Sequence, residues 1–177
     1  MRIRRHLPLY LVVAMAWVIC ADAQTTRPRA SLHPAVAEIA LEPGASADLV
    51  LEVSMPPEVH VQAHQPKDPL LVPTVLAVEP PEGISVESIA YPSPTELTQA
   101  GRADPLLVLG PTFEIRVRLS VSPEARDGVR SVPVALRYQA CNETVCFPPA
   151  RATAAWTVAV AARRGLGLVA WGLRSRI

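Results

Sequence analysis

Apolar and polar residues alternate along three stretches of this chain. Between residues 47 and 53, 113 and 121, and 131 and 140, every second position is apolar or small, and most positions between are polar or charged. A period of two is typical of an antiparallel β-strand with one buried face and one face in water. After residue 23, no stretch of 11 or more residues has the spacing of an amphipathic helix.

Shorter runs of the same type lie between turns rich in Pro and Gly, and they bring the number of predicted strands to nine. The predicted strands cover residues 36–41, 47–54, 59–63, 70–78, 84–90, 106–109, 113–121, 131–141 and 152–160. The segment 91–104 is expected to be a polar loop without a strand, of a length that is often functional. About eight or nine short antiparallel strands in one domain predict an all-β sandwich.

The first 23 residues have the three parts of a secretory signal peptide. A basic start with three arginines precedes the apolar run 7–21, and Ala21–Ala23 is a cleavage site of the small-x-small type. Cleavage after Ala23 leaves a single predicted domain over residues 24–162 and a basic, apolar tail over residues 163–177. The protein is therefore expected to be periplasmic or secreted.

The predicted domain is mildly acidic, and its charge changes the partners to expect. Residues 24–162 carry 10 basic and 15 acidic side chains, while the tail adds four arginines and no acid. An acidic domain is unsuited to the phosphate backbone, so nucleic acid is not an expected partner. The apolar part of the tail is far shorter than the roughly 20 residues of a spanning helix. A disordered or docked terminus and weak contact with a membrane surface are the alternatives.

Two cysteines, Cys141 and Cys146, remain after removal of the signal peptide, and four residues separate them. Cysteines at the facing ends of a hairpin have Cα atoms about 4.5 or 5.5 Å apart, which is within disulfide reach. Cys141 continues the polar parity of strand 131–141. This parity predicts that its thiol points away from the core, toward solvent or a covering loop.

The spacing of the cysteines leaves two interpretations open. A disulfide that closes so short a loop stabilises the fold by roughly 2 kcal/mol, so it would be a weak structural staple. The alternative is a redox pair that cycles between dithiol and disulfide, which the outward parity of Cys141 favours. A structural hairpin disulfide would instead indicate a non-catalytic exported binding or assembly module.

Copper or zinc binding by the thiols together with His33, His60 or His64 is a third interpretation. His60 and His64 lie in a strand-like context, where four residues span about 13 Å, too far for one ion without a bend. No Ser/His/Asp arrangement and no glycine-rich phosphate loop stands out in the sequence. The residues by themselves indicate no cofactor.

The segment YQACNETVCFPP resembles the N-terminal periplasmic domain family of the thiol:disulfide interchange protein DsbD. The matching residues of the motif are Tyr138, Gln139, Ala140, Cys141, Cys146, Phe147, Pro148 and Pro149. Short motifs at residues 60–66, 71–74 and 91–92 follow the order found in that family. The resemblance covers residues 31–160, which is nearly all of the predicted domain.

This resemblance implies an immunoglobulin-like sandwich and a thiol-disulfide oxidoreductase activity at Cys141 and Cys146. Its partners would be thioredoxin-fold redox proteins or a membrane thiol transporter, and the relay would serve oxidised exported proteins, including those of cytochrome c biogenesis. The family closes a loop over the pair with an aromatic side chain, and Tyr91 is the candidate here. Gln139 and Pro148 are expected to flank the site, and Tyr138 and Phe147 are expected either to flank it or to pack in the sandwich. No membrane part and no thioredoxin-like domain follows in this sequence. If the chain is complete, either electrons are expected to arrive from a separate protein or the domain has another role.

Overall fold

The computed structural model describes residues 27–161, which form twelve β-strands and no helix. The predicted signal peptide 1–23 and tail 163–177 lie outside the described residues. The strands are β1 (Ser31–Pro34), β2 (Glu38–Leu41), β3 (Ser46–Ser54), β4 (His60–Gln62), β5 (Val75–Val78), β6 (Ile84–Ala90), β7 (Thr95–Leu97), β8 (Leu106–Leu109), β9 (Thr112–Val121), β10 (Gly128–Tyr138), β11 (Ala140–Cys141) and β12 (Ala150–Val160).

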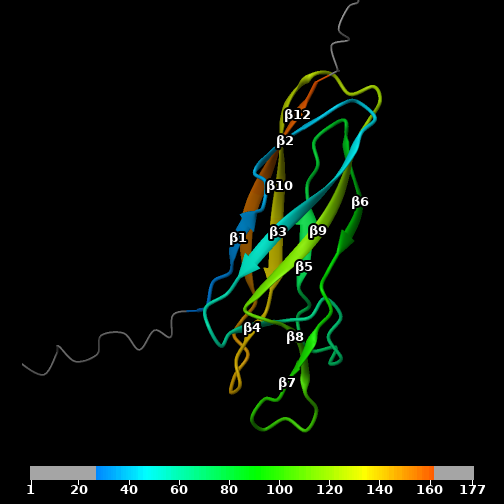
Figure 1. Cartoon of the computed structure of the whole chain (residues 1–177). Helices are drawn as coiled ribbons and strands as arrows, with labels where there is room; N and C mark the ends of the chain where they lie inside the picture. Colours follow the sequence, from blue (N-terminus) through cyan, green and yellow to red (C-terminus); the bar gives the residue numbers. More distant parts are fainter. Residues whose placement is uncertain (1–26, 162–177) are drawn as a thin grey trace, which may run out of the picture.

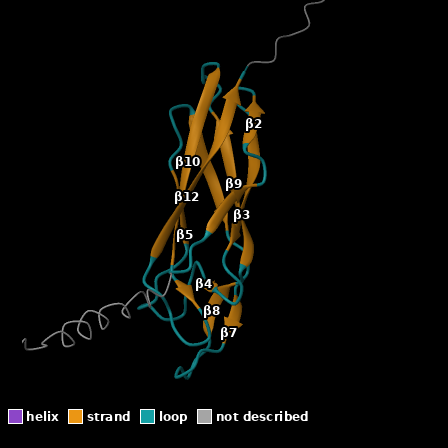
Figure 2. Ribbon diagram, turned by 90° about the vertical axis from the view of Figure 1, so that its left-hand side faces the viewer, coloured by secondary structure: helices purple, strands orange, loops and turns teal. Residues whose placement is uncertain are grey.

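Two four-stranded sheets face each other along the length of the molecule (Figures 1 and 2). One has the strand order β1-β3-β9-β6 and the other the order β2-β12-β10-β5. Their pairings are antiparallel, except for the parallel pairing of β12 with β2. The architecture confirms the predicted all-β, immunoglobulin-like sandwich.

The alternating positions of the sequence fill the space between the two sheets. In β9 every second residue from Phe113 to Val121 is buried, while Glu114, Arg116 and Arg118 are exposed on the other face. The facing sheet contributes the apolar residues of β10 and β12, including Trp156, which is 1% exposed. Burial of these side chains is the main favourable contribution to the stability of the sandwich.

The structure contains three more strands than the sequence predicts. The polar strand β1 was missed, and the predicted strand 131–141 is divided at Gln139 into β10 and β11. The expectation of a loop without a strand over residues 91–104 was wrong, because β7 lies within it and pairs with β8. β7 has only three residues, too few for an alternation of polar and apolar positions to be visible.

A third, smaller sheet has the order β11-β4-β8-β7 and lies at one end of the sandwich (Figures 1 and 2). β4 is bonded on both edges, to β11 on one side and to β8 on the other. The chain therefore leaves the long strand β10 and enters this end sheet directly at Ala140–Cys141. This connection brings the predicted cysteine pair to the tip of the molecule.

Leu51→Ala tests the assignment of the core. Leu51 is fully buried between the sheets, so its truncation is expected to lower the free energy of unfolding by about 2–5 kcal/mol. The matched variant Leu70→Ala removes the same atoms from a side chain that is 88% exposed, and should change stability by less than about 0.5 kcal/mol. Urea unfolding followed by circular dichroism measures both, and equal effects of the two variants would contradict the assignment.

Candidate functional site

Cys141 and Cys146 are joined by a disulfide with an S–S distance of 2.09 Å. The two residues face each other across an antiparallel bridge, as the hairpin prediction requires. The Phe147 amide donates to the Ala140 carbonyl at 2.8 Å, and the Asn142 amide donates to the Val145 carbonyl at 2.9 Å. The disulfide thus occupies the non-hydrogen-bonded position between two bonded pairs, where opposing Cα atoms approach most closely.

The side chain of Asn142 closes the tip of this hairpin. Its Oδ1 accepts hydrogen bonds from the backbone amides of Thr144 at 3.0 Å and Val145 at 2.8 Å, and from the Thr144 hydroxyl at 2.9 Å. An asparagine that bonds the backbone two residues ahead is a common way to form a tight turn. The turn is therefore held by bonds that do not involve sulfur.

The two cysteines differ in burial. Cys141 is fully buried, whereas Cys146 is only partly buried. Cys141 belongs to a small cluster with Leu106 and Val108, separate from the main core, and Leu97 packs against it. Parity predicts a thiol that points away from the main core, toward solvent or a covering loop. Cys141 lies in the separate cluster, and Leu71 of the loop that follows β4 also packs there, so this face is covered and not open to solvent.

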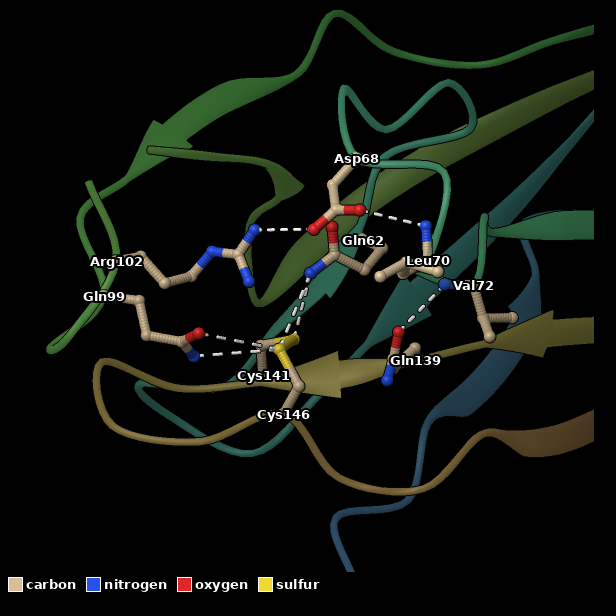
Figure 3. Close-up of polar contacts among 9 residues, drawn as sticks. All are labelled: Gln62, Asp68, Leu70, Val72, Gln99, Arg102, Gln139, Cys141 and Cys146. Carbon is tan, nitrogen blue, oxygen red and sulfur yellow. Dashed lines mark hydrogen bonds and ion pairs between the residues drawn. A yellow bond between two sulfur atoms is a disulfide. The ribbon is translucent and has the colours of Figure 1, made fainter. Parts of the chain in front are cut away.

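Two side-chain amides contact the disulfide (Figure 3). Nε2 of Gln62 lies 3.0 Å from Sγ of Cys141 and 3.7 Å from Sγ of Cys146. Nε2 of Gln99 lies 3.7 Å from Sγ of Cys146 and donates to the Asn142 carbonyl at 2.9 Å. Neither residue was predicted from the sequence as part of the site. The alternation in strand 59–63 places Gln62 on the face of β4 opposite Val61, but it does not reveal that this face is covered.

Two loops are bound to the hairpin and to each other. The Ala100 amide donates to the Glu143 carbonyl at 2.8 Å, so the segment around Gln99 lies on the hairpin tip. Arg102 forms a 2.7 Å ion pair with Asp68, which joins this segment to the loop 67–72 (Figure 3). The predicted flanking residue Gln139 holds the second loop, because its Oε1 accepts from the Val72 amide at 2.9 Å.

The sequence of the chain matches a family model that describes the N-terminal part of the thiol:disulfide interchange protein DsbD, over residues 30–157. The chain belongs to this family. Membership and the observed disulfide together indicate, at the level of the DsbD N-terminal family, a periplasmic thiol-disulfide exchange module with thioredoxin-like partners. No helix within residues 27–161 is long and apolar enough to cross a membrane.

No curated protein sequence matches the chain significantly. Solved structures similar to it include a family 123 glycoside hydrolase from Clostridium perfringens, with 8% identity and a TM-score of 0.37 over 76% of this chain. The chain spans 27% of the length of that hydrolase. A structure from aggregative adherence fimbriae of enteroaggregative Escherichia coli has 13% identity and a TM-score of 0.36, over 76% of this chain and 99% of the other.

The remaining residues of the DsbD-like motif lie around the hairpin rather than on the sulfurs. Tyr138 is 1% exposed in the main core, where its hydroxyl accepts a hydrogen bond from the Ala30 amide at 2.8 Å. Phe147 packs against the same core, and Pro148 is exposed after the hairpin. Tyr138 and Phe147 therefore join the hairpin to the sandwich.

Tyr91, the predicted aromatic cap, stacks on His64 with ring centroids 3.9 Å apart. Its hydroxyl accepts a hydrogen bond from the Leu76 amide at 2.8 Å, and burial raises the pKa of this hydroxyl. The residue between 91 and 104 that contacts Cys146 is Gln99. Tyr91 thus lies at the base of the loop, against the edge of β5.

The histidines of the metal interpretation lie apart. His33 is opposite Glu52 in the first sheet, His60 is opposite Cys141 in the end sheet, and His64 stacks on Tyr91. Within residues 27–161, no group of three or more His, Cys, Asp or Glu side chains is placed to hold a metal ion. The copper or zinc interpretation therefore gains no support from the described residues.

The ion pair between the two loops is expected to weaken in acid. The hydrogen bonds from Arg102 and from the Leu70 amide lower the pKa of Asp68 below its ordinary value of about 3.9. A lowered pKa means that the contribution of Asp68 is complete above the ordinary value and is lost as pH falls through the folded value. Carboxyl NMR titration should show this low pKa, and Arg102→Gln should raise it. An ordinary pKa for Asp68 in the unmodified protein would contradict the contact.

Proposed function

We propose that this protein relays electrons from a thioredoxin-type or membrane thiol donor to oxidised exported proteins through Cys141 and Cys146. The observation that carries the proposal is the position of the disulfide at the tip of the molecule, with Cys141 fully buried and Cys146 only partly buried. A partner is therefore expected to approach the pair from the side of Cys146.

The geometry favours a defined direction of exchange. A partner thiolate attacks Sγ of Cys146, a new S–S bond forms between partner and Cys146, and the Cys141–Cys146 bond breaks. Cys141 leaves with the electron pair as a thiolate. A second thiol of the partner then attacks the mixed disulfide and releases Cys146, so that the partner is oxidised and the pair is reduced by two electrons. The reverse sequence delivers the electrons to an oxidised acceptor.

Export by a cleaved signal peptide over residues 1–23 is part of the same proposal. A periplasmic location suits the DsbD N-terminal family and permits the disulfide to persist between turnovers. The donor and the acceptor are then expected to be proteins of the thioredoxin fold, with Cys141 and Cys146 as the reacting residues and no cofactor.

A structural disulfide in a non-catalytic exported module is the second candidate. One observation favours it, namely the complete burial of Cys141. Against it, the disulfide lies outside the main core, and backbone hydrogen bonds on both sides already close the hairpin. A bond across so short a loop contributes only about 2 kcal/mol to stability.

Capture of a partner through a single cysteine tests the relay. Cys141→Ser leaves the accessible Cys146, which can be activated with an aromatic disulfide reagent and offered to a thioredoxin that lacks its resolving cysteine. A covalent complex is expected on a non-reducing gel. The matched variant Cys146→Ser leaves only the buried Cys141 and should react at least about tenfold more slowly. Equal capture by both variants would contradict the assignment of Cys146, and capture by neither would contradict the relay.

The reduction potential distinguishes the relay from the structural disulfide. We expect equilibration with glutathione or dithiothreitol buffers to give a potential above about −300 mV, within reach of thioredoxin-type donors. The fractions of dithiol and disulfide can be measured by alkylation and mass spectrometry. A potential well below that limit would identify the bond as structural.

A further inference from the structure

Gln62 lies against the sulfurs at the centre of the end sheet. Its side chain is 0% exposed, and its Nε2 is 3.0 Å from Sγ of Cys141 (Figure 3). The backbone on both sides of the residue is fixed, because its amide donates to the Gln139 carbonyl and its carbonyl accepts from the Thr74 hydroxyl. The amide group is therefore held in place against Cys141.

Gln62 keeps this position at a cost. Its Oε1 is buried and has no hydrogen-bond partner. An unpaired buried acceptor destabilises a fold, and native structures contain few of them. An apolar side chain of the same length would avoid this cost beside Leu106 and Val108. Gln62 thus places a polar amide among apolar side chains, with its donor Nε2 against the sulfur of Cys141.

The strength of the hydrogen bond from this amide depends on the oxidation state of the sulfur that accepts it. A disulfide sulfur is a weak acceptor, so the 3.0 Å contact contributes little while the bond is intact. A thiolate carries a full charge, and a hydrogen bond to an ionised acceptor is roughly twice as strong as a neutral one. Burial among apolar side chains raises the energy of a thiolate, unless a donor is already in place.

We propose that the side-chain amide of Gln62 stabilises the thiolate that leaves from Cys141 when a partner thiolate attacks Cys146. This inference rests on the proposed exchange function and assigns a catalytic role to one further residue. As the S–S bond breaks, the electron pair collects on Sγ of Cys141, and the Nε2–H group donates to it without movement of the backbone. A leaving thiol of lower pKa departs faster, so the amide accelerates the step in which Cys141 leaves.

Gln99 provides a comparison within the same site. Its Nε2 donates to the Asn142 carbonyl at 2.9 Å and is 3.7 Å from Sγ of Cys146. It thus contacts the attacked sulfur rather than the leaving one. The charged or titratable groups around the site include His60, opposite Cys141 on β4, Glu143 on the hairpin, and the Asp68–Arg102 ion pair of the two loops (Figure 3). The residues that β7 and β8 place against it are apolar.

The pKa of the Cys141 thiol tests the proposal directly. In a Cys146→Ala background Cys141 is the only thiol of residues 24–177, and its ionisation can be followed by thiolate absorbance or by the NMR shift of its Cβ. Gln62→Met, which keeps the length but removes the donor, should raise this pKa by about one pH unit or more. Gln99→Met should leave it within a few tenths. His60 and Glu143 are the same in both variants, so their charges contribute equally.

The rate of reduction supplies the second measurement. With both cysteines present, dithiothreitol should reduce the Gln62→Met disulfide about tenfold more slowly than that of the unmodified protein. If Gln62→Met does not fold, Gln62→Asn replaces it in both measurements. This variant keeps the polar group but withdraws it from the sulfur by one methylene, so a raised Cys141 pKa and slower reduction are again expected. An unchanged Cys141 pKa in a folded variant would overturn the proposal.

These measurements are independent of any protein partner. A raised Cys141 pKa together with failure of Cys146 to capture a thioredoxin would reject the relay and leave the assignment of Gln62 intact. Normal capture of a thioredoxin by Cys146, together with an unchanged Cys141 pKa in Gln62→Met, would support the relay and reject the role of Gln62. The two conclusions can therefore fail separately.

Discussion

The site depends on the pairing of β4 with β11 on one edge and with β8 on the other. These bonds build a small sheet beyond the end of the sandwich, with Cys141 in its edge strand β11 and Gln62 in the neighbouring strand β4. The pairing brings Gln62 against the sulfurs and places Leu106 and Val108 of β8 in one cluster with Cys141. Within this cluster Cys141 is fully buried, whereas Cys146 is partly buried, and the proposed direction of exchange depends on this difference.

The covering layer is assembled from parts of the chain that are distant in sequence. Residues 67–72 contact Gln139, and residues 98–102 contact the tip of the hairpin. Their polar attachment consists of backbone hydrogen bonds, two glutamine side-chain amides and two ion pairs, Lys67–Glu96 and Arg102–Asp68. Each polar contact of this kind contributes little to the free energy of unfolding, so the loops 67–72 and 98–102 belong to the low-stability part of the structure. The sandwich beneath them supplies the rigid support.

Much of the fold follows from the sequence, because the strands of the sandwich have one wet and one dry face. In β9 and β10 the alternation identifies nearly every buried side chain. The end sheet was less predictable, because its strands have only two to four residues and three of them, β4, β8 and β11, have buried residues at neighbouring positions instead of an alternation. The identity of the cysteine pair follows from its spacing and motif, whereas the burial of Cys141 and the contact with Gln62 come from β4, whose position depends on pairings distant in sequence.

The turn closed by Asn142 has a further consequence for how the two oxidation states are told apart. The hydrogen bonds that close the turn use no sulfur atom, so the backbone of the turn is held independently of the disulfide. Under the proposed exchange, reduction would then remove one covalent bond and leave these backbone bonds in place. A partner would have little change of backbone shape to recognise, and it would distinguish the two oxidation states chiefly at the sulfur atoms.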